Sequence, residues 1–266
     1  MNSIIINDPT LRDGNHAVKH QLSAAQIKIY AKAANDAHIP ILEVGPGMGV
    51  LTNFLNTENK GGVYVAEIDR DSIAYLIENN IVEKDKILGD FLHLDLHENF
   101  DDQVNIIGNF PYNISSQILF RAIENKELIP EFAGMFQKEV AERITAKPGN
   151  KQFGILSVMT QAYFDVEYLF TVDEHVFDPP PRVKSAVIHL IRKEKITLDC
   201  DEKLFKTIVK TTFNTRRKML RGSLRRIIGK HEILHDEFFQ KRPEQLSVEE
   251  FVWLTNQMRE VIDKGE

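Results

Sequence analysis

Strand-like and helix-like segments alternate along the first two-thirds of the chain, and this alternation restricts the possible folds more than any other feature. Strands are predicted at Ile41–Val44, Val63–Ile68, Lys86–Gly89, Val104–Gly108 and Glu131–Gln137. Helical patterns lie before and between them, at Leu22–Asn35, Asp71–Asn79, Ser115–Glu124 and Glu139–Thr145. Strands spaced by such helices need right-handed crossovers, so we expect an α/β fold with a parallel sheet covered on both faces.

The character of the chain changes towards its C-terminus. Two β-branched segments, Tyr163–Val172 and Ala186–Ile191, are predicted to pair antiparallel at the edge of the sheet. After about Lys193 the patterns are helical, and they predict helices at Leu204–Gly229, Ile233–Phe239 and Val248–Ile262. The predicted domains are therefore residues 1–194, which hold the sheet, and residues 195–266, a small all-helical domain.

Basic residues gather in one part of this helical tail. The 28 residues from Lys203 to Lys230 contain ten lysines or arginines and no aspartate or glutamate. The other 238 residues hold 23 basic and 39 acidic side chains, a net charge of −16. Such a chain repels polyanions over most of its surface and attracts them at one place. We predict a contact with a phosphate backbone there, the alternative being a solvated helix face.

The ends of the predicted strands carry candidate ligand-binding residues. Ligands of open α/β sheets bind beyond the carboxyl ends of the strands. After the first strand, Gly45 and Gly47 let a ligand lie against the backbone. Glu67 follows Gly45 by 22 residues, close to the offset of roughly 20 at which an acid accepts hydrogen bonds from ribose hydroxyls. Asp90 is expected to accept from the exocyclic amine of an adenine, with Phe91 beside the ring.

The glycine turn differs from the turns that bind phosphates. Val50 replaces the last glycine of the dinucleotide fingerprint, and no Lys-Ser or Lys-Thr pair follows, so the turn is not a P-loop. A nucleoside without a pyrophosphate fits better. S-adenosylmethionine is the predicted cofactor, because its sulfonium tolerates the acidic residues Glu43, Glu67 and Asp90. No metal ligand is assigned.

The segment Asn109-Phe110-Pro111-Tyr112 follows the fourth predicted strand and suggests a reaction. The exocyclic amine of a purine is a poor nucleophile because its lone pair is delocalised into the ring. The side-chain oxygen of Asn109 and a carbonyl near Phe110–Pro111 are expected to accept its two N–H bonds and turn the lone pair towards a methyl donor. Tyr112 offers a flat face for an extruded base. The alternative is a strand stopped by asparagine and proline.

Together these motifs resemble the ribosomal RNA adenine dimethyltransferases, over about Ile41 to Glu260. The resemblance rests on ILEVGPGMGVLT, VAEIDRD, GDFL, GNFPYNISSQI, QKEVAERI, FDPPPRVKSAV and FNTRRKMLRGSL. It implies a Rossmann-like methyltransferase sheet with a small helical C-terminal domain, and methyl transfer to N6 of adjacent adenines in small-subunit ribosomal RNA. It implies donor-binding roles for Glu43, Gly45, Gly47, Glu67, Ile68, Asp90, Phe91 and Asn109. It assigns the reacting adenine to Asn109, Pro111 and Tyr112, with Phe177 and Pro179–Pro181 flanking the base.

The resemblance also predicts partners and location. Small-subunit ribosomal RNA, in the assembling 30S subunit, is the expected partner of the basic segment, through Arg216, Arg217, Lys218, Arg221, Arg225 and Arg226. No apolar run reaches the roughly 18–20 residues that a bilayer span needs, so no membrane is expected. Cys200 is the one cysteine and has no internal partner, which favours a reducing cytoplasm. We expect a monomer.

The N-terminal segment departs from that family. Residues 4–40 resemble the opening of the metal-dependent 4-hydroxy-2-oxovalerate aldolases, in which the residues matching Arg12, Asp13 and His16 polarise substrate, bind metal and transfer protons. This resemblance suggests a chimeric chain whose usual lid is replaced. It leaves two alternatives open: an impaired ribosomal RNA-binding module, and an aldolase. The aldolase is disfavoured because it needs a closed barrel of roughly 250 residues and a His-x-His pair, which the nine histidines here do not form.

Overall fold

The computed structural model describes residues 38–177 and 180–264, which group into two compact units. The first unit holds the described residues up to Ala141 together with Asp165–Arg192, and the second holds Glu142–Phe164 and the residues from Lys193 onward. The second unit thus takes in a segment that the predicted division at residue 194 assigned to the sheet. The two compact units do not show that either part folds by itself, so the predicted domain boundary at residue 194 stays a prediction.

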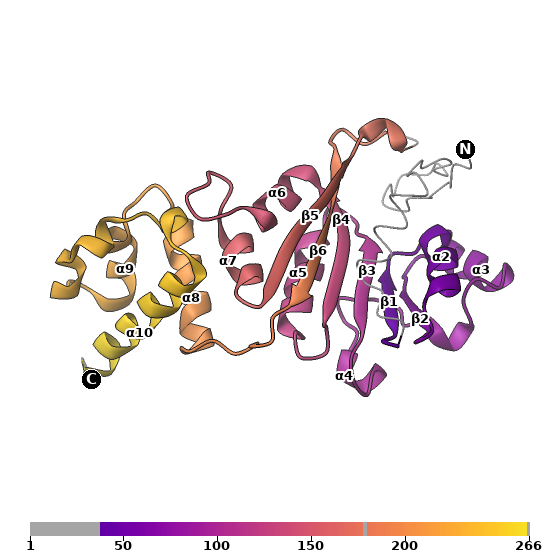
Figure 1. Cartoon of the computed structure of the whole chain (residues 1–266), viewed down its shortest axis with the longest axis horizontal. Helices are drawn as coiled ribbons and strands as arrows, with labels where there is room; N and C mark the ends of the chain where they lie inside the picture. The colour runs from indigo at the N-terminus through magenta and orange to yellow at the C-terminus, as the bar shows by residue number, and fades with distance from the viewer. Residues whose placement is uncertain (1–37, 178–179, 265–266) are drawn as a thin grey trace. The chain divides into compact units, whose positions relative to one another are not determined.

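Six strands of the first unit form one sheet in the order β2-β1-β3-β4-β6-β5, with β2 and β5 at its edges (Figure 1). The strands β2, β1, β3 and β4 run parallel to one another, and β6 runs antiparallel to β4. The expected α/β class is confirmed, and of the two segments expected to pair antiparallel at the edge, β6 pairs antiparallel with β4 while β5 forms the edge. The strands are β1 (Ile41–Val44), β2 (Val63–Ala66), β3 (Asn105–Asn109), β4 (Glu131–Gln137), β5 (Phe164–Val172) and β6 (Ser185–Arg192).

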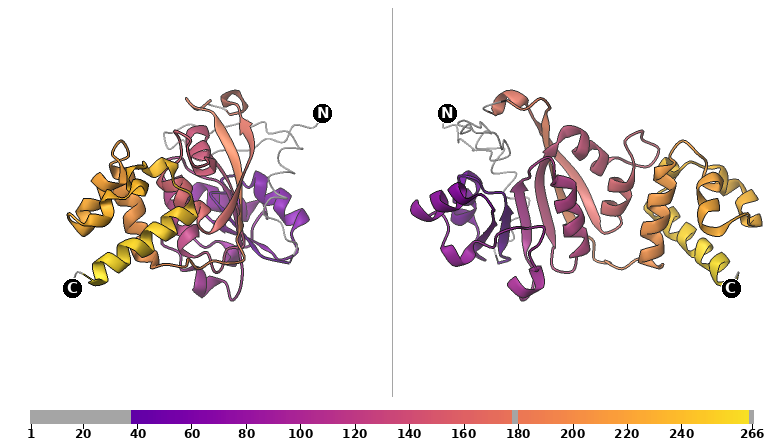
Figure 2. Two further views of the ribbon diagram at one scale, coloured as in Figure 1. Left: turned by 60° about the vertical axis from the view of Figure 1, so that its left-hand side comes forward. Right: turned by 180° about the vertical axis from the view of Figure 1, so that it is seen from behind.

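Helices connect these strands, and α5 lies over one face of the sheet in the view from behind (Figure 2). The Asp69 side chain begins α3 by accepting from the amide of Ser72 at 2.8 Å, the expected role of an N-cap aspartate. The helices are α2 (Val50–Glu58), α3 (Arg70–Glu78), α4 (Leu96–Asn99), α5 (Ser115–Glu124) and α6 (Lys138–Thr145), with short 3₁₀ turns η1 (Lys84–Lys86) and η2 (Glu174–Val176).

Two predicted strands are corrected by the structure. The strand at Lys86–Gly89 is wrong: only Ile87 makes a bridge, to Val65, after which Gly89 turns the chain with a φ of +77°. The strand expected to reach Ile68 ends at Ala66. The Glu67 carboxylate accepts from the amides of Ile68 and Asp69, so these two amides cannot pair with a neighbouring strand.

A cluster of aromatic rings, formed by Phe110 after β3 and two residues of β4, holds the end of β3 in place. The fully buried Phe110 lies with its ring centroid 5.2 Å from Phe132 and 5.3 Å from Phe136. Gly134 of β4 makes room for it, since a Cβ there would lie 2.1 Å from Phe110 Cε2. Phe110 anchors the chain between Asn109 and Pro111.

The second unit is helical and packs around its own aromatic core. Phe213 lies 6.3 Å from Phe153 and 5.8 Å from Phe251 between ring centroids. Its elements are α7 (Ile155–Gln161), α8 (Glu202–Asn214), α9 (Leu220–Ile228), α10 (Val248–Lys264), η3 (Glu232–His235), η4 (Glu237–Gln240) and η5 (Pro243–Gln245), with the end of α6. Among the described residues, none of the helices combines the length and hydropathy of a membrane span.

Two predicted helices of this unit are broken. The helix at Leu204–Gly229 divides into α8, which ends at Asn214, and α9, which begins at Leu220, where the Leu220 amide donates to the Lys241 carbonyl at 2.9 Å. The helix at Ile233–Phe239 is replaced by η3 and η4. Between them Asp236 is extended and its side chain accepts from the Phe238 amide at 2.8 Å, which starts a new turn.

Candidate functional site

The sheet reverses its strand order between β1 and β3, and the candidate site lies at the carboxyl ends of these two strands. Gly45 follows β1 and Asn109 ends β3. A Cβ on Gly45 would lie 3.6 Å from the Asn109 carbonyl oxygen and 3.8 Å from Pro111 Cδ. The structure therefore brings together two segments, the glycine turn and residues 109–112, that are more than 60 positions apart in sequence.

The glycine turn adopts a conformation that other residues rarely take. Gly45 and Gly47 have φ values of +71° and +54°. The buried Glu67 holds the turn, since its Oε2 accepts from the Gly47 amide at 3.4 Å. Its Oε1 accepts from the amides of Ile68 at 2.8 Å and Asp69 at 3.0 Å. A carboxylate has about four acceptor positions, so room remains for a ribose hydroxyl.

Glu43 lies inside the sheet at the base of the same turn. It is 2% exposed, and Thr52 of α2 donates to its Oε2 at 2.6 Å. Burial raises the pKa of Glu43 to about 8, against the opposing hydrogen bond from Thr52 and with help from the charge of Glu67. Glu43 is thus mainly protonated at neutral pH and ties β1 to α2. Thr52 was not singled out from the sequence, although its place in GMGVLT could have indicated it.

Asp90 lies in an exposed turn on the predicted adenine side of the site. Its oxygens accept from the Leu92 amide at 2.9 Å and contact His93 Nδ1 at 2.7 Å. Partial desolvation raises the pKa of Asp90, but the bonds from His93 and Leu92 outweigh it, so that pKa lies below its ordinary value. Ile68 is 57% exposed and can pack against a ring, whereas the Phe91 ring is buried.

The segment 109–112 carries an unsatisfied amide. Asn109 is 9% exposed, and no described residue hydrogen-bonds to its Nδ2. A buried donor of this kind is costly unless an acceptor satisfies it, and the side-chain oxygen of the same amide is the atom that can accept from an adenine amine. The Pro111 carbonyl accepts from the Ile114 amide, which leaves the Phe110 carbonyl as the candidate second acceptor. The Tyr112 hydroxyl bonds to Ser185 Oγ at the start of β6, which fixes the ring.

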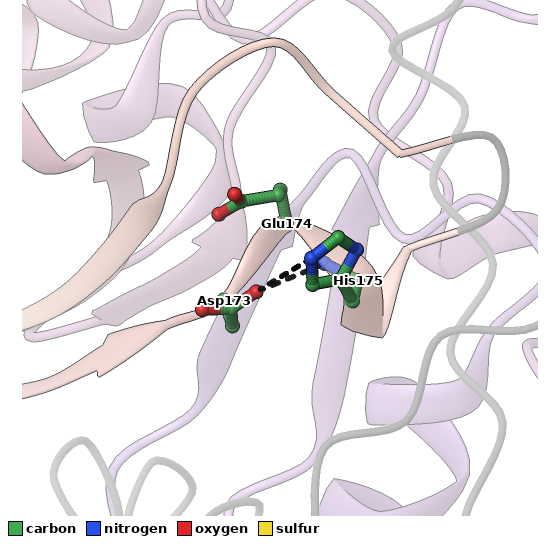
Figure 3. Close-up of side chains that lie close together, drawn as sticks. All are labelled: Asp173, Glu174 and His175. Carbon is green, nitrogen blue, oxygen red and sulfur yellow. Dashed lines mark hydrogen bonds and ion pairs between the residues drawn. The ribbon is translucent and has the colours of Figure 1, made fainter.

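Phe177 lies elsewhere than expected for a base-stacking ring. It is 5% exposed and belongs to a core cluster with Met135 and Val187, so its ring would have to leave that cluster to reach a base. Pro179 lies outside the described residues. Just before Phe177, Asp173, Glu174 and His175 lie close together (Figure 3). Lys184 donates to Asp173 at 2.8 Å and keeps the pKa of that carboxyl below its ordinary value.

The basic residues predicted to bind RNA lie on α9 and on the turn before it. Arg216 is partly buried, 3.8 Å from the Glu244 carboxylate, and donates to the Asn150 carbonyl at 3.4 Å. The other five are exposed, and none forms an ion pair with a described residue; they are Arg217, Lys218, Arg221, Arg225 and Arg226. Five unpaired cations on adjoining positions make a surface suited to a polyanion.

Known proteins with similar sequences identify the family. The model of the ribosomal RNA adenine dimethylase family matches residues 14–256. This chain belongs to the ribosomal RNA adenine dimethylase family. It is 58% identical over 227 residues to the ribosomal RNA small subunit methyltransferase A of Bacteroides thetaiotaomicron, covering 84% of this chain and 85% of the relative. For the enzyme of the same name from Phocaeicola vulgatus the identity is 55% over 248 residues, covering 92% and 88%.

Solved structures of other methyltransferases share the fold. A dimethyladenosine transferase from Plasmodium falciparum matches with a TM-score of 0.76 at 23% identity, covering 90% of this chain and 97% of that one. A 23S ribosomal RNA methyltransferase matches with a TM-score of 0.64 at 24% identity, covering 89% and 99%. The predicted family resemblance and the Rossmann-like methyltransferase architecture with a helical C-terminal part are confirmed.

The aldolase resemblance of the N-terminal segment gains no support. The family match begins at residue 14, well inside the segment interpreted as foreign. The described strands form an open sheet with an antiparallel member, whereas an aldolase of that family needs a closed barrel. The aldolase alternative is therefore dropped. Arg12, Asp13 and His16, and the predicted helix Leu22–Asn35, lie outside the described residues.

Proposed function

We propose that this chain transfers methyl groups from S-adenosylmethionine to N6 of adjacent adenines in small-subunit ribosomal RNA. The observation that carries the proposal is the position of Asn109, which ends β3 and lies next to the glycine turn at the switch point of the sheet. Membership of the ribosomal RNA adenine dimethylase family supports the reaction, and relatives more than 50% identical named for the small subunit support the substrate.

The acceptor side is built from residues 109–112. The Asn109 side chain and the Phe110 carbonyl orient the amine of the target adenine, because two acceptors placed at its N–H bonds direct the nitrogen lone pair away from them. Phe110 is fixed by Phe132 and Phe136, so these acceptors are placed before the substrate arrives. The Tyr112 ring, held through Ser185, stacks on the base. The alkylated amine loses its proton to water, so no strong base is required.

The donor side fits a nucleoside with a positively charged centre. Gly45 and Gly47 give backbone contact, the spare acceptor capacity of Glu67 suits the ribose, and Asp90 and Ile68 suit the adenine. When bound, S-adenosylmethionine supplies the activated methyl group. Glu43 does not contact the donor in this proposal; it accepts a hydrogen bond from Thr52 and so ties β1 to α2 on either side of the glycine turn.

The five exposed cations of the α9 surface bind the ribosomal RNA backbone, and Arg216 supports the turn that carries the first of them. We propose that the natural substrate is RNA within the assembling 30S subunit and that the protein acts in the cytoplasm as a monomer.

Incorporation of tritiated methyl groups into unmethylated small ribosomal subunits tests this function. Wild-type protein is expected to label the RNA at N6 of adenine, and hydrolysis of the RNA to nucleosides shows whether mono- or dimethyladenosine forms. Absence of label from subunits that a relative such as the Bacteroides thetaiotaomicron enzyme can methylate would refute the proposal.

A further inference from the structure

Arg121 of α5 has contacts that neither the resemblance nor the reaction accounts for. Its Nε donates to the Phe91 carbonyl at 3.1 Å, and its NH2 group donates to the Leu94 carbonyl. The residue is partly buried, and its partners are 27 and 30 positions earlier in the chain. A guanidinium that bridges two backbone carbonyls fixes the turn between them, because its donors are held in a rigid fork.

The turn that Arg121 holds is the one that carries Asp90. Its amides close on Asp90 itself: those of His93 and Leu94 donate to the Asp90 carbonyl at 3.0 and 2.9 Å. The turn is therefore held by its own amides, which donate to the Asp90 carbonyl, and by Arg121, which donates to the carbonyls of Phe91 and Leu94. The arginine charge also acts on the Asp90 carboxylate and favours its ionised, accepting form.

The other end of the same helix adjoins the acceptor segment. Ser115, the first residue of α5, donates through Oγ to the Tyr112 carbonyl at 3.2 Å, and the Ile114 amide donates to Pro111. The ten residues of α5 thus join the 109–112 segment at one end to the Asp90 turn at the other. A helix is stiff on this length scale, so it can keep the two in fixed register.

We propose that Arg121 is a positioning residue that fixes the Asp90 turn for the adenine of the methyl donor, on the helix whose first residue contacts Tyr112. This inference rests on the proposed function. It assigns to Arg121 an effect on donor binding, through the turn, without contact between the guanidinium and the reacting atoms.

The test compares Arg121→Met with Arg192→Met. Arg192 at the end of β6 also donates to two backbone carbonyls, those of Lys126 at 3.0 Å and Glu127, in a turn with no predicted ligand role. Both variants remove a guanidinium of the same kind. Arg121→Met is expected to raise the KM for S-adenosylmethionine on the order of tenfold with kcat changed less than about threefold, while Arg192→Met leaves KM unchanged.

Adenosine as a competitive inhibitor isolates the adenine end of the donor. Its inhibition constant is expected to rise by the same factor as KM in Arg121→Met, and Arg121→Lys is expected to recover part of the loss. In the double variant Arg121→Met/Asp90→Asn, KM should rise no further than in the more impaired single variant, since both changes act on one turn.

Three results would overturn the inference: an unchanged KM in Arg121→Met, an equal rise in Arg192→Met, or additive effects in the double variant. Calorimetric titration with S-adenosylhomocysteine separates this outcome from failure of the proposed function. If wild-type protein binds that product but does not label ribosomal RNA, the function is wrong, and the change in binding on Arg121→Met still tests the role of Arg121.

Discussion

The donor and acceptor segments of the first unit and the basic surface of α9 in the second unit are built on opposite principles. At the carboxyl ends of β1 and β3, polar groups are buried and nearly all of them are bound by neighbours, as for Glu43, Glu67 and Thr52. On α9 the cations are exposed, and Arg217, Arg221 and Arg225 have no ionic partner among the described residues.

This difference follows from what each region recognises. A reacting amine must be placed to a fraction of an ångström, which requires groups fixed by packing and hydrogen bonds. A phosphate backbone is recognised by charge density, which tolerates mobile side chains and shares the binding energy among many contacts. Single substitutions should therefore act sharply in the first region and gradually in the second.

The sharpest break is expected at Asn109. Asn109→Ala removes one of the two acceptors for the amine and should lower methyl transfer at least about a hundredfold, while the donor binds only more weakly. Single-turnover labelling measures the rate, and calorimetry with S-adenosylhomocysteine measures binding. Unchanged turnover would remove Asn109 from the mechanism.

The second prediction concerns the packing of Phe110 against Gly134. A Cβ at Gly134 would lie 2.1 Å from the Phe110 ring, so Gly134→Ala should cost about 1–3 kcal/mol of stability and displace the 109–112 segment. Urea denaturation and labelling measure the two effects. Gly222→Ala in α9 is the matched control: the nearest atom would be 3.6 Å away, and a helical alanine should stabilise by about 0.5–1 kcal/mol. Equal behaviour of the two variants would contradict the contrast between the regions.

The buried carboxyl predicts a pH dependence of stability. Because burial raises the pKa of Glu43 to about 8 from 4.5, the unfolded chain releases this proton first, and the wild type should lose stability as pH rises from about 4.5 to 8. The slope is at most about 1.4 kcal/mol per pH unit from this group. Glu43→Gln should remove that slope and be more stable than wild type at pH 8, as measured by urea denaturation between pH 5 and 8. A parallel pH profile for both proteins would show that Glu43 is not held protonated.

Substitutions on the α9 surface should weaken RNA binding gradually, and the loss should depend on salt concentration. Arg217→Glu/Arg221→Glu should weaken association with small-subunit RNA roughly tenfold and reduce the slope of log affinity against log salt by about 2, with the affinity for S-adenosylhomocysteine unchanged. Filter binding at several salt concentrations measures this. Arg216→Glu should in addition lower thermal stability, because it breaks contacts to Glu244 and Asn150. An unaltered salt slope would place the RNA contact elsewhere.

Particular elements show where prediction from the sequence succeeded. Ser115–Glu124 and Glu131–Gln137 were predicted with the bounds that the structure gives, because a helical period marks the first and a short buried run between polar ends marks the second. The strand at Lys86–Gly89 and the single helix at Leu204–Gly229 failed. Local pattern there does not reveal that Gly89 turns the chain, or that the Lys241 carbonyl binds the Leu220 amide.

The candidate site divides in the same way. Gly45 and Asn109 could be selected because strand ends and glycine turns leave a local signature, whereas Asp90 was selected from a predicted strand that the structure does not contain. Thr52 and Arg121 were not selected, and the buried position of Phe177 was not foreseen. Their partners lie 9 to 30 positions away or on other strands, and no local period records such contacts.

The sequence by itself determined the α/β class, the family and the residues at the strand ends, since periodicity, turn chemistry and motif spacing are properties of neighbouring residues. Only the tertiary structure decided that Gly45 lies against Asn109, that burial raises the pKa of Glu43, and that Arg121 donates to two carbonyls of the Asp90 turn. Those facts depend on which distant groups share one buried space, and the hydrogen bonds and desolvation that result exist only once the chain has folded.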